Sequence, residues 1–254
     1  MFQLQTDIDM RKAATLLISA LFSMPCIAES VDYKLSLSLA GISIGAGSCS
    51  YRENSVMHEG RDAMQLQLIM STGRAAGLFY HLRDTVTSVV KPDGTPVSYC
   101  KIANEGGVHA VETAAFAQTN DGWSVGIGID KDGTAPYELN LSYPDKVYDM
   151  LSMLKSMRLT DTDNMGEGDV LDIPMVNGNL IVVQHIVCTG KTVIKDGKGD
   201  KHNCMEWSVR DNKLEKERET MRVYVTDDGK HIPVRMDIVL GKCFIKALLN
   251  GYSE

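Results

Sequence analysis

The stretch RVYVTDDGKHIPVRMDIVLGKCFIKALL, residues 222–249, decides the fold. Its apolar and polar residues alternate in three runs, which the short polar segments DDGK and GK separate. Alternation with a period of two is typical of strands that bury one face, and Asp-Gly is typical of the turns between such strands. Pro233 lacks a backbone donor, so it indicates either an edge strand or the start of a strand. The stretch therefore predicts three antiparallel strands that share one core face.

Strand patterns also dominate the rest of the chain. Residues 33–39 (YKLSLSL) and 64–70 (MQLQLIM) alternate between apolar and polar side chains. Gly45 and Gly47 interrupt the first strand region and predict a bend or a close approach of two backbones. Residues 180–187 (LIVVQHIV) are apolar on both faces apart from Gln and His, which predicts a central strand covered on both sides.

Residues 144–159 carry a helical pattern, with apolar residues at i, i+3, i+4 and i+7 and a proline suited to the first turn. We expect this helix to pack against a large, curved antiparallel sheet, in its concavity or across one end. The fold class is thus mainly β, an open or partly closed barrel with one main α-helix. Two roles stay open for the apolar face of the helix: ordinary packing, or a flexible wall for an apolar ligand. The candidate ligand-binding residues are Val147, Met150, Leu151, Leu154 and Met157.

Composition limits the partners of the chain. The 254 residues carry a net charge of −7, which argues against nucleic acid or an anionic membrane surface as the main partner, although a local basic patch is compatible with it. Aromatic residues make up only 6%, which disfavours a sugar-stacking surface. No repeat, linker or low-complexity segment divides residues 29–254, so we expect a single β-rich domain.

The first 28 residues have the features of a secretory leader. Met10, Arg11 and Lys12 form a short basic start, and the apolar run AATLLISALF (residues 13–22) follows. A small residue, Ala28, ends the segment, so we expect cleavage after it and a periplasmic location. The run is too short for a membrane-spanning helix, which needs about 20 apolar residues. Two alternatives are a lipid anchor at Cys26 and a buried N-terminal helix, and Met10 is an alternative start to Met1.

Export would permit disulfides among the five remaining cysteines, Cys49, Cys100, Cys188, Cys204 and Cys243. Cys188 and Cys204 form the best candidate pair, because a predicted hairpin brings their strands together. The alternative is that all five are small buried hydrophobic residues. No Cys/His spacing suits a metal, so we predict neither a metal nor a cofactor.

No familiar catalytic motif occurs in the chain, so we predict no catalytic residues and a protein that is not an enzyme. The histidines are scattered. His185, in the most apolar strand, is expected to be a core histidine with a satisfied hydrogen bond, and a ligand or acid–base role is the alternative. Clustering of His81, His109 or His185 with carboxylates would support an envelope hydrolase.

Several segments together resemble one exported bacterial family, domain of unknown function 3108. They are YKLSLSLAGISIGAGSCSY (33–51), TGRAAGLFYHLRDTVTSVV (72–90), YDMLSMLKSMRL (148–159), CTGK (188–191) and the closing stretch from residue 223 to 249. Tyr224 stands where the family usually has Trp, and residues 195–203 look like a local elaboration. The closing signature is carried by Tyr224, Thr226, Asp227, Asp228, Ile232, Pro233, Val234, Gly241 and Leu248. The resemblance implies an envelope location and brings no activity or site residues.

Three functions follow as hypotheses. The first is a non-enzymatic envelope protein that binds an apolar small molecule or lipid between sheet and helix. The second is a structural or assembly module that acts through an envelope protein partner, with the Gly-rich segment of residues 123–129 as the candidate exposed edge. The third is a hydrolase whose site is assembled from distant residues.

Overall fold

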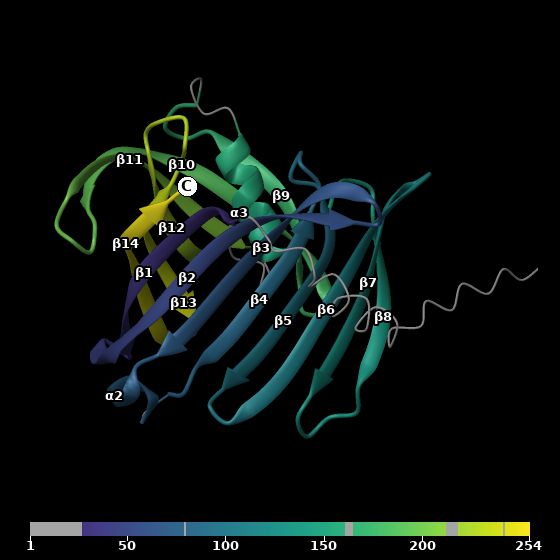
Figure 1. Cartoon of the computed structure of the whole chain (residues 1–254), viewed down its shortest axis with the longest axis horizontal. Helices are drawn as coiled ribbons and strands as arrows, with labels where there is room; N and C mark the ends of the chain where they lie inside the picture. The colour runs from purple at the N-terminus through teal and green to yellow at the C-terminus, as the bar shows by residue number, and fades with distance from the viewer. Residues whose placement is uncertain (1–26, 79, 161–164, 212–217, 241) are drawn as a thin grey trace, which may run out of the picture.

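The computed structural model describes residues 27–78, 80–160, 165–211, 218–240 and 242–254. Within this part of the chain, fourteen strands form one antiparallel sheet, which two helices accompany. The sheet curls into a deep, open half-barrel, and the longer helix lies at its upper end (Figure 1). The predicted mainly β fold, an open barrel with one main helix, is confirmed. The predicted leader and the anchor alternative at Cys26 lie almost entirely outside the described residues.

The strands range from 7 residues in β8 to 17 residues in β2. The elements are β1 (Ile27–Leu39), β2 (Ile42–His58), β3 (Arg61–Thr72), α2 (Arg74–Gly77), β4 (Arg83–Val90), β5 (Pro96–Glu105), β6 (Val108–Thr119), β7 (Gly122–Lys131), β8 (Tyr137–Tyr143), α3 (Met150–Leu159), β9 (Val170–Asn177), β10 (Leu180–Lys195), β11 (Lys201–Asp211), β12 (Arg218–Thr226), β13 (Pro233–Leu240) and β14 (Cys243–Ser253).

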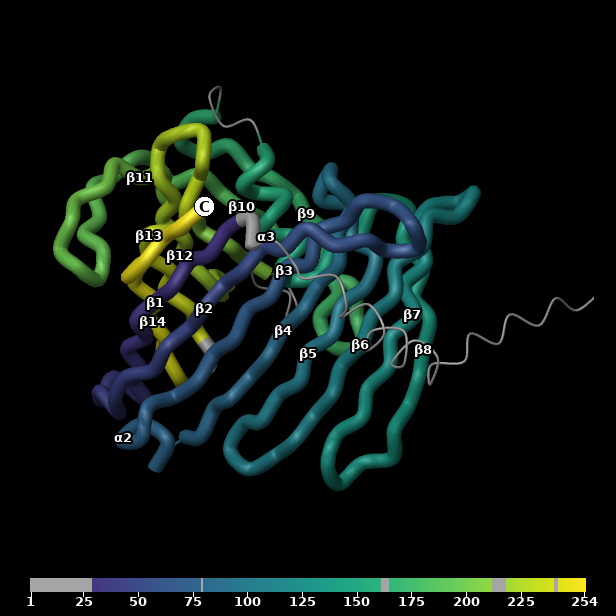
Figure 2. Tube along the Cα trace, viewed as in Figure 1, coloured from purple at the N-terminus to yellow at the C-terminus, as the bar shows by residue number. Residues whose placement is uncertain are grey.

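Two meanders make up the sheet. Strands β1 to β8 lie side by side in chain order, and strands β9 to β14 do the same. Antiparallel pairing of β1 with β14 joins the meanders, so that the first and last strands run along each other (Figure 2). The edges of the sheet are therefore β8 and β9, which follow each other in the chain with α3 between them.

Helix α3 begins at Met150, so the predicted start at Pro144 is wrong. Asp149 is the N-cap: its carboxylate accepts from the backbone N–H groups of Leu151 and Ser152 at 2.9 and 3.0 Å. Ser152 Oγ in turn accepts from the backbone N–H of Asp149, which completes a capping box.

Val147, which precedes α3, fits the apolar stripe of the predicted helix but does not belong to the helix. Val147 is fully buried, but it packs into a separate cluster with Phe116, Val125 and Ile127 of β6 and β7. The next residue, Tyr148, exchanges backbone hydrogen bonds with β9. Val147 therefore has helical spacing to the apolar residues of α3 in the sequence, although it belongs to an extended segment.

The main core lies between α3 and the inner face of strands from both meanders. Inward-facing residues of β1 (Val31, Tyr33, Leu35 and Leu37) are at most 4% exposed. They alternate with exposed Asp32, Lys34 and Ser36, which confirms the period-two pattern of the sequence.

The predicted close backbone approach at the early glycines is confirmed. A Cβ added to Gly45, whose φ is +137°, would lie 2.8 Å from the Cβ of Ala76 in α2. Gly73, just before α2, donates to the carbonyl of Ala46 at 2.7 Å. The glycines therefore let the α2 segment lie directly on β2.

The closing stretch forms β12, β13 and β14, as predicted. Pro233 starts β13, which pairs on both sides, so the strand-start alternative holds and the edge alternative does not. Asp228 organises the loop before it, because its carboxylate accepts from Thr226 Oγ1 and from the backbone N–H groups of Lys230 and His231.

Two predictions about β10 are wrong. Its residues 180–188 alternate between buried and partly exposed, so only one face is covered. Cys188 lies opposite Trp207, whereas Cys204 lies opposite Thr192, four residues further along β10. The predicted pair therefore does not form, and all five described cysteines are free thiols. Burial raises the pKa of Cys49 to about 12, as expected for a small core residue.

Candidate functional site

The predicted ligand-binding face of α3 forms part of the packed core. Val147 and Leu151 are fully buried, and Met157 is buried. Met150 and Leu154 are half-buried and pack against the main cluster. The structure brings the four helical residues together with the sheet, whereas Val147 lies in the separate cluster near β7.

The space between α3 and strands β11 and β12 is nearly filled. It contains a cavity of about 20 Å³ lined by Leu154, Met157, Trp207, Val223, Val225 and neighbouring residues. A cavity of this size holds about one water molecule, whereas pockets for apolar ligands measure roughly 300–1,000 Å³. A ligand at this position would require α3 to move, so ligand binding by the five residues stays a prediction.

A charged clamp holds α3 in the mouth of the half-barrel. The clamp consists of Lys155 and Arg158 on α3 with Glu29 of β1 and Glu53 of β2. Lys155 Nζ lies 2.8 Å from Glu53, and Arg158 lies 2.7 Å from Glu29 and 3.2 Å from Glu53. Tyr51 also donates to Glu53 at 2.8 Å. These contacts fix the helix to two strands of the first meander.

The charged clamp is buried, so its ion pairs strongly determine the position of α3. The side chain of Glu53 is 3% exposed and that of Arg158 is 12% exposed. Burial alone would lower the pKa of Arg158, but hydrogen bonds and charge from Glu29 raise it overall. Burial and the adjacent Glu53 raise the pKa of Tyr51 well above its ordinary value, so Tyr51 is a neutral donor.

The loop of the closing stretch holds the same helix from the other side. Arg158 donates to the carbonyl oxygen of Lys230 at 3.2 Å, and His231 Nδ1 lies 3.0 Å from the carbonyl oxygen of Arg158. The loop between β12 and β13 thus has a role beyond a turn: it receives the C-terminal end of α3.

Outside the clamp lies a shallow, solvent-open depression of about 210 Å³. Its charges are balanced within the protein, since Lys230 pairs with Glu254 at 2.7 Å and Lys155 and Arg158 pair with the clamp carboxylates. Its lining residues are Glu29, Lys155, Arg158, Leu159, Gly229, Lys230, Tyr252 and Glu254.

A second charged cluster lies on β4 and β5, away from α3. The side chain of Asp84 is 1% exposed and lies 3.6 Å from Lys101 Nζ, which also pairs with Glu105 at 3.0 Å. Tyr80 donates to Glu105 at 3.1 Å. Burial and a hydrogen bond with Glu105 raise the pKa of Asp84 to about 6. Burial would also raise the pKa of Glu105, but hydrogen bonds from Asp84, Lys101 and Tyr80 lower it overall. Below about pH 6 the pair therefore holds a protonated Asp84 beside an ionised Glu105.

The two edges of the sheet meet without closing it. Val176 and Ile181, from the hairpin of β9 and β10, pack in one cluster with Leu139 and Leu141 on the inner side of β8. Part of the β9 edge is covered, because Tyr148 bonds to Pro174 and Val176. Among the described residues, β8 has backbone hydrogen bonds only with β7.

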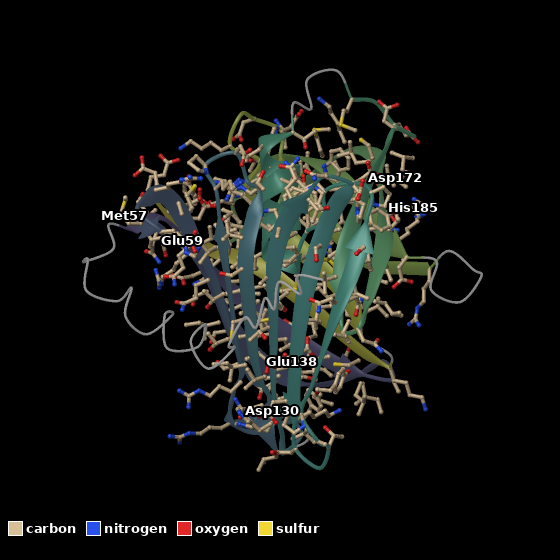
Figure 3. The ribbon with its side chains drawn as sticks, turned by 90° about the vertical axis from the view of Figure 1, so that its right-hand side faces the viewer. Met57, Glu59, Asp130, Glu138, Asp172 and His185 are labelled. Carbon is tan, nitrogen blue, oxygen red and sulfur yellow. The ribbon has the colours of Figure 1, made fainter. Side chains whose placement is uncertain are left out.

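The histidines do not gather in one cleft. His185 contacts Asp172 at 2.6 Å on the outer face, where both side chains are partly exposed, so the core-histidine prediction is wrong (Figure 3). His109 contacts Asn104, and His81 is exposed near α2. In the part of the chain that the structure describes, no group of three or more His, Cys, Asp or Glu side chains could hold a metal ion.

The predicted edge at residues 123–129 is wrong. This segment is β7, which pairs with β6 and β8 and buries Val125 and Ile127. The true edge, β8, has only a short alternating pattern, ELNLSY (138–143), as its sequence signal. The clamp was also missed, although Lys155 and Arg158, two cations at i and i+3 beside buried apolar residues, could have indicated it.

Comparison with known proteins places the chain in a family. The family described as "Protein of unknown function (DUF3108)" matches residues 31–246, so the chain belongs to it. The chain is also similar to a crystal structure of a β-barrel-like protein of domain of unknown function DUF1849 from Brucella abortus. The TM-score is 0.56 at 10% identity, over 90% of this chain and 97% of the other, which shows a shared fold. No curated protein matches the chain. Within the described residues, no helix is both long and apolar enough to cross a membrane.

Proposed function

We propose that this protein is a non-enzymatic module of the cell envelope that binds an extended segment of a protein partner along β8. The observation that carries the proposal is the edge position of β8, which among the described residues pairs only with β7. An edge strand presents a row of backbone donors and acceptors that an added strand can satisfy. The nearly filled space beneath α3 favours this function over an apolar carrier.

The side chains of β8 define what the partner segment should look like. Inward-facing Tyr137 is 45% exposed, and Leu139 and Leu141 are only half-buried. Outward-facing Glu138 and its neighbour Asp130 on β7 are exposed acids (Figure 3). An added strand with apolar residues facing inward and Lys or Arg facing outward would complement both faces.

Site-specific photocrosslinking tests the proposal. A photoreactive residue at Ser142, exposed on the outer face of β8, should crosslink to a defined segment of one protein in cells. The matched control is Ser36, an exposed outward-facing serine of β1, which pairs on both sides. A synthetic peptide of the captured segment should then slow amide hydrogen exchange in β8. Equal capture from Ser36, or no protection of β8 by the peptide, would contradict the proposal.

A further inference from the structure

Three turns at the end of the half-barrel opposite α3 form one continuous surface. They are the β1–β2 turn, residues 73–83 around α2, and the β13–β14 turn, and we call their described residues the basic rim. Ala40 donates to the carbonyl of Lys242 at 2.9 Å, which joins the first turn to the third. The contact of Gly45 with Ala76 joins the first to the second. Figure 1 shows α2 beside the β1–β2 turn at the lower left.

Apolar side chains project from this surface into solvent. Leu78 is 86% exposed and Ile42 is 71% exposed. Leu39 and Phe244, at the ends of β1 and the start of β14, are 45% and 36% exposed. Single exposed apolar residues are common in soluble proteins, but a group on adjoining turns at one end indicates an interaction surface.

The charge of the rim is opposite to that of the whole protein. Arg74, Arg83 and Lys242 are exposed, and none has an ion-pair partner among the described residues. No Asp or Glu occurs in residues 38–46, 73–83 or 238–244, although the chain as a whole carries −7. The acids nearest in sequence are already engaged: Asp84 is buried beside Lys101, and Asp237 pairs with Arg235.

We propose that the basic rim binds the surface of an anionic lipid bilayer. Exposed aliphatic tips with cations around them fit an interface where acyl chains lie beneath negative headgroups. The net charge of −7 is not in conflict, because the field of the rim acts locally within a Debye length of about 8 Å. This proposal does not depend on the β8 edge, which lies on another side of the sheet.

Vesicle co-sedimentation tests the membrane-binding proposal. The protein used is the form that accumulates in cells expressing the full chain. Binding to phosphatidylglycerol–phosphatidylcholine vesicles should exceed binding to pure phosphatidylcholine vesicles and should fall with salt. The double substitution Arg74→Ser with Lys242→Ser should weaken binding about fivefold for each charge removed. Ile42→Ser with Leu78→Ser should weaken it about tenfold or more.

Matched control variants lie elsewhere on the molecule. Arg61→Ser with Lys198→Ser removes two exposed cations that form no ion pair within the described part of the chain. Met57→Ser with Val193→Ser removes two exposed apolar residues, and both control variants should bind like the wild type. Circular dichroism checks that each variant is folded. Equal loss in controls and rim variants, or equal binding to both vesicle types, would overturn the proposal. So would self-association that the rim variants abolish, since the rim would then contact a second copy of the chain.

Discussion

The side chain of Asp84 lies between Lys101 and Glu105, so its charge depends on two opposing neighbours. Burial and the hydrogen bond with Glu105 favour the protonated form, and the cation of Lys101 favours the ionised form. The net result is a pKa of about 6, above the ordinary 3.8. The backbone N–H of Asn104 also donates to Asp84 at 3.0 Å, so an amide could keep the geometry.

This raised pKa predicts a pH dependence of stability. Between the unfolded value of 3.8 and the folded value of about 6, the folded protein binds more protons than the unfolded chain. Asp84 therefore stabilises the fold at the acid end of this window, and that contribution is lost as pH rises through 6. Asp84→Asn removes the titration, so its unfolding free energy relative to wild type should rise by on the order of 2 kcal/mol from pH 4 to pH 7.

Urea unfolding at closely spaced pH values measures the difference. Glu105, whose pKa is lowered, contributes in the opposite direction and mainly below pH 4.5, so the rise between pH 5 and pH 7 reports on Asp84. A difference between Asp84→Asn and wild type that stays constant from pH 4 to pH 7 would contradict the assignment. Asp130→Asn, which replaces an exposed carboxylate on the outer face of β7, serves as the matched control.

At the scale of elements, α3 is positioned by contacts that are far apart in the chain. Arg158 meets Glu29 across 129 residues and the Lys230 carbonyl across 72 residues. Its capping box, in contrast, is local, because Asp149 and Ser152 lie within one turn. The start of α3 could have been predicted from that Asp-x-x-Ser spacing. The alternation of β1 and the three closing strands could be predicted for the same reason: neighbours in sequence carry the pattern.

The charged clamp predicts a large effect from one substitution. Arg158→Ala leaves Glu29 and Glu53 buried with one cation fewer, which should lower the unfolding free energy by about 3–5 kcal/mol. Lys230→Ala removes the exposed pair with Glu254 but keeps the backbone carbonyl that Arg158 uses, so it should cost less than about 1 kcal/mol. Urea unfolding followed by circular dichroism compares the two. Similar small losses in both variants would show that the clamp does not hold α3.

At the scale of the molecule, the joining of the two meanders into one open sheet could not be predicted from the sequence. The pairing of β1 with β14 spans nearly the whole chain, and no local pattern encodes which edge strand stays free. The strand of residues 123–129 was a reasonable edge candidate because Gly126 and Gly128 place no side chains on its outer face. In the fold, β8 pairs with that strand, so β8 itself becomes the edge, although its sequence alternates over a shorter segment. The predicted cysteine pair failed for a similar reason: the hairpin register places Cys188 opposite Trp207 and Cys204 opposite Thr192, four residues apart along β10.

The packing of the whole molecule predicts that the protein is purified without a bound apolar molecule. The cavity between α3 and the sheet measures about 20 Å³, and Trp207, which lines it, is 3% exposed. Native mass spectrometry after detergent-free purification should therefore show the mass of the polypeptide alone. Trp207→Ala provides the control, since a large cavity lined by apolar residues can bind benzene. Benzene should raise the Tm of Trp207→Ala and leave that of the wild type unchanged, as measured by calorimetry. A lipid that co-purifies with the wild type would show instead that α3 moves aside, and would restore Met150, Leu154 and Met157 as ligand-binding residues.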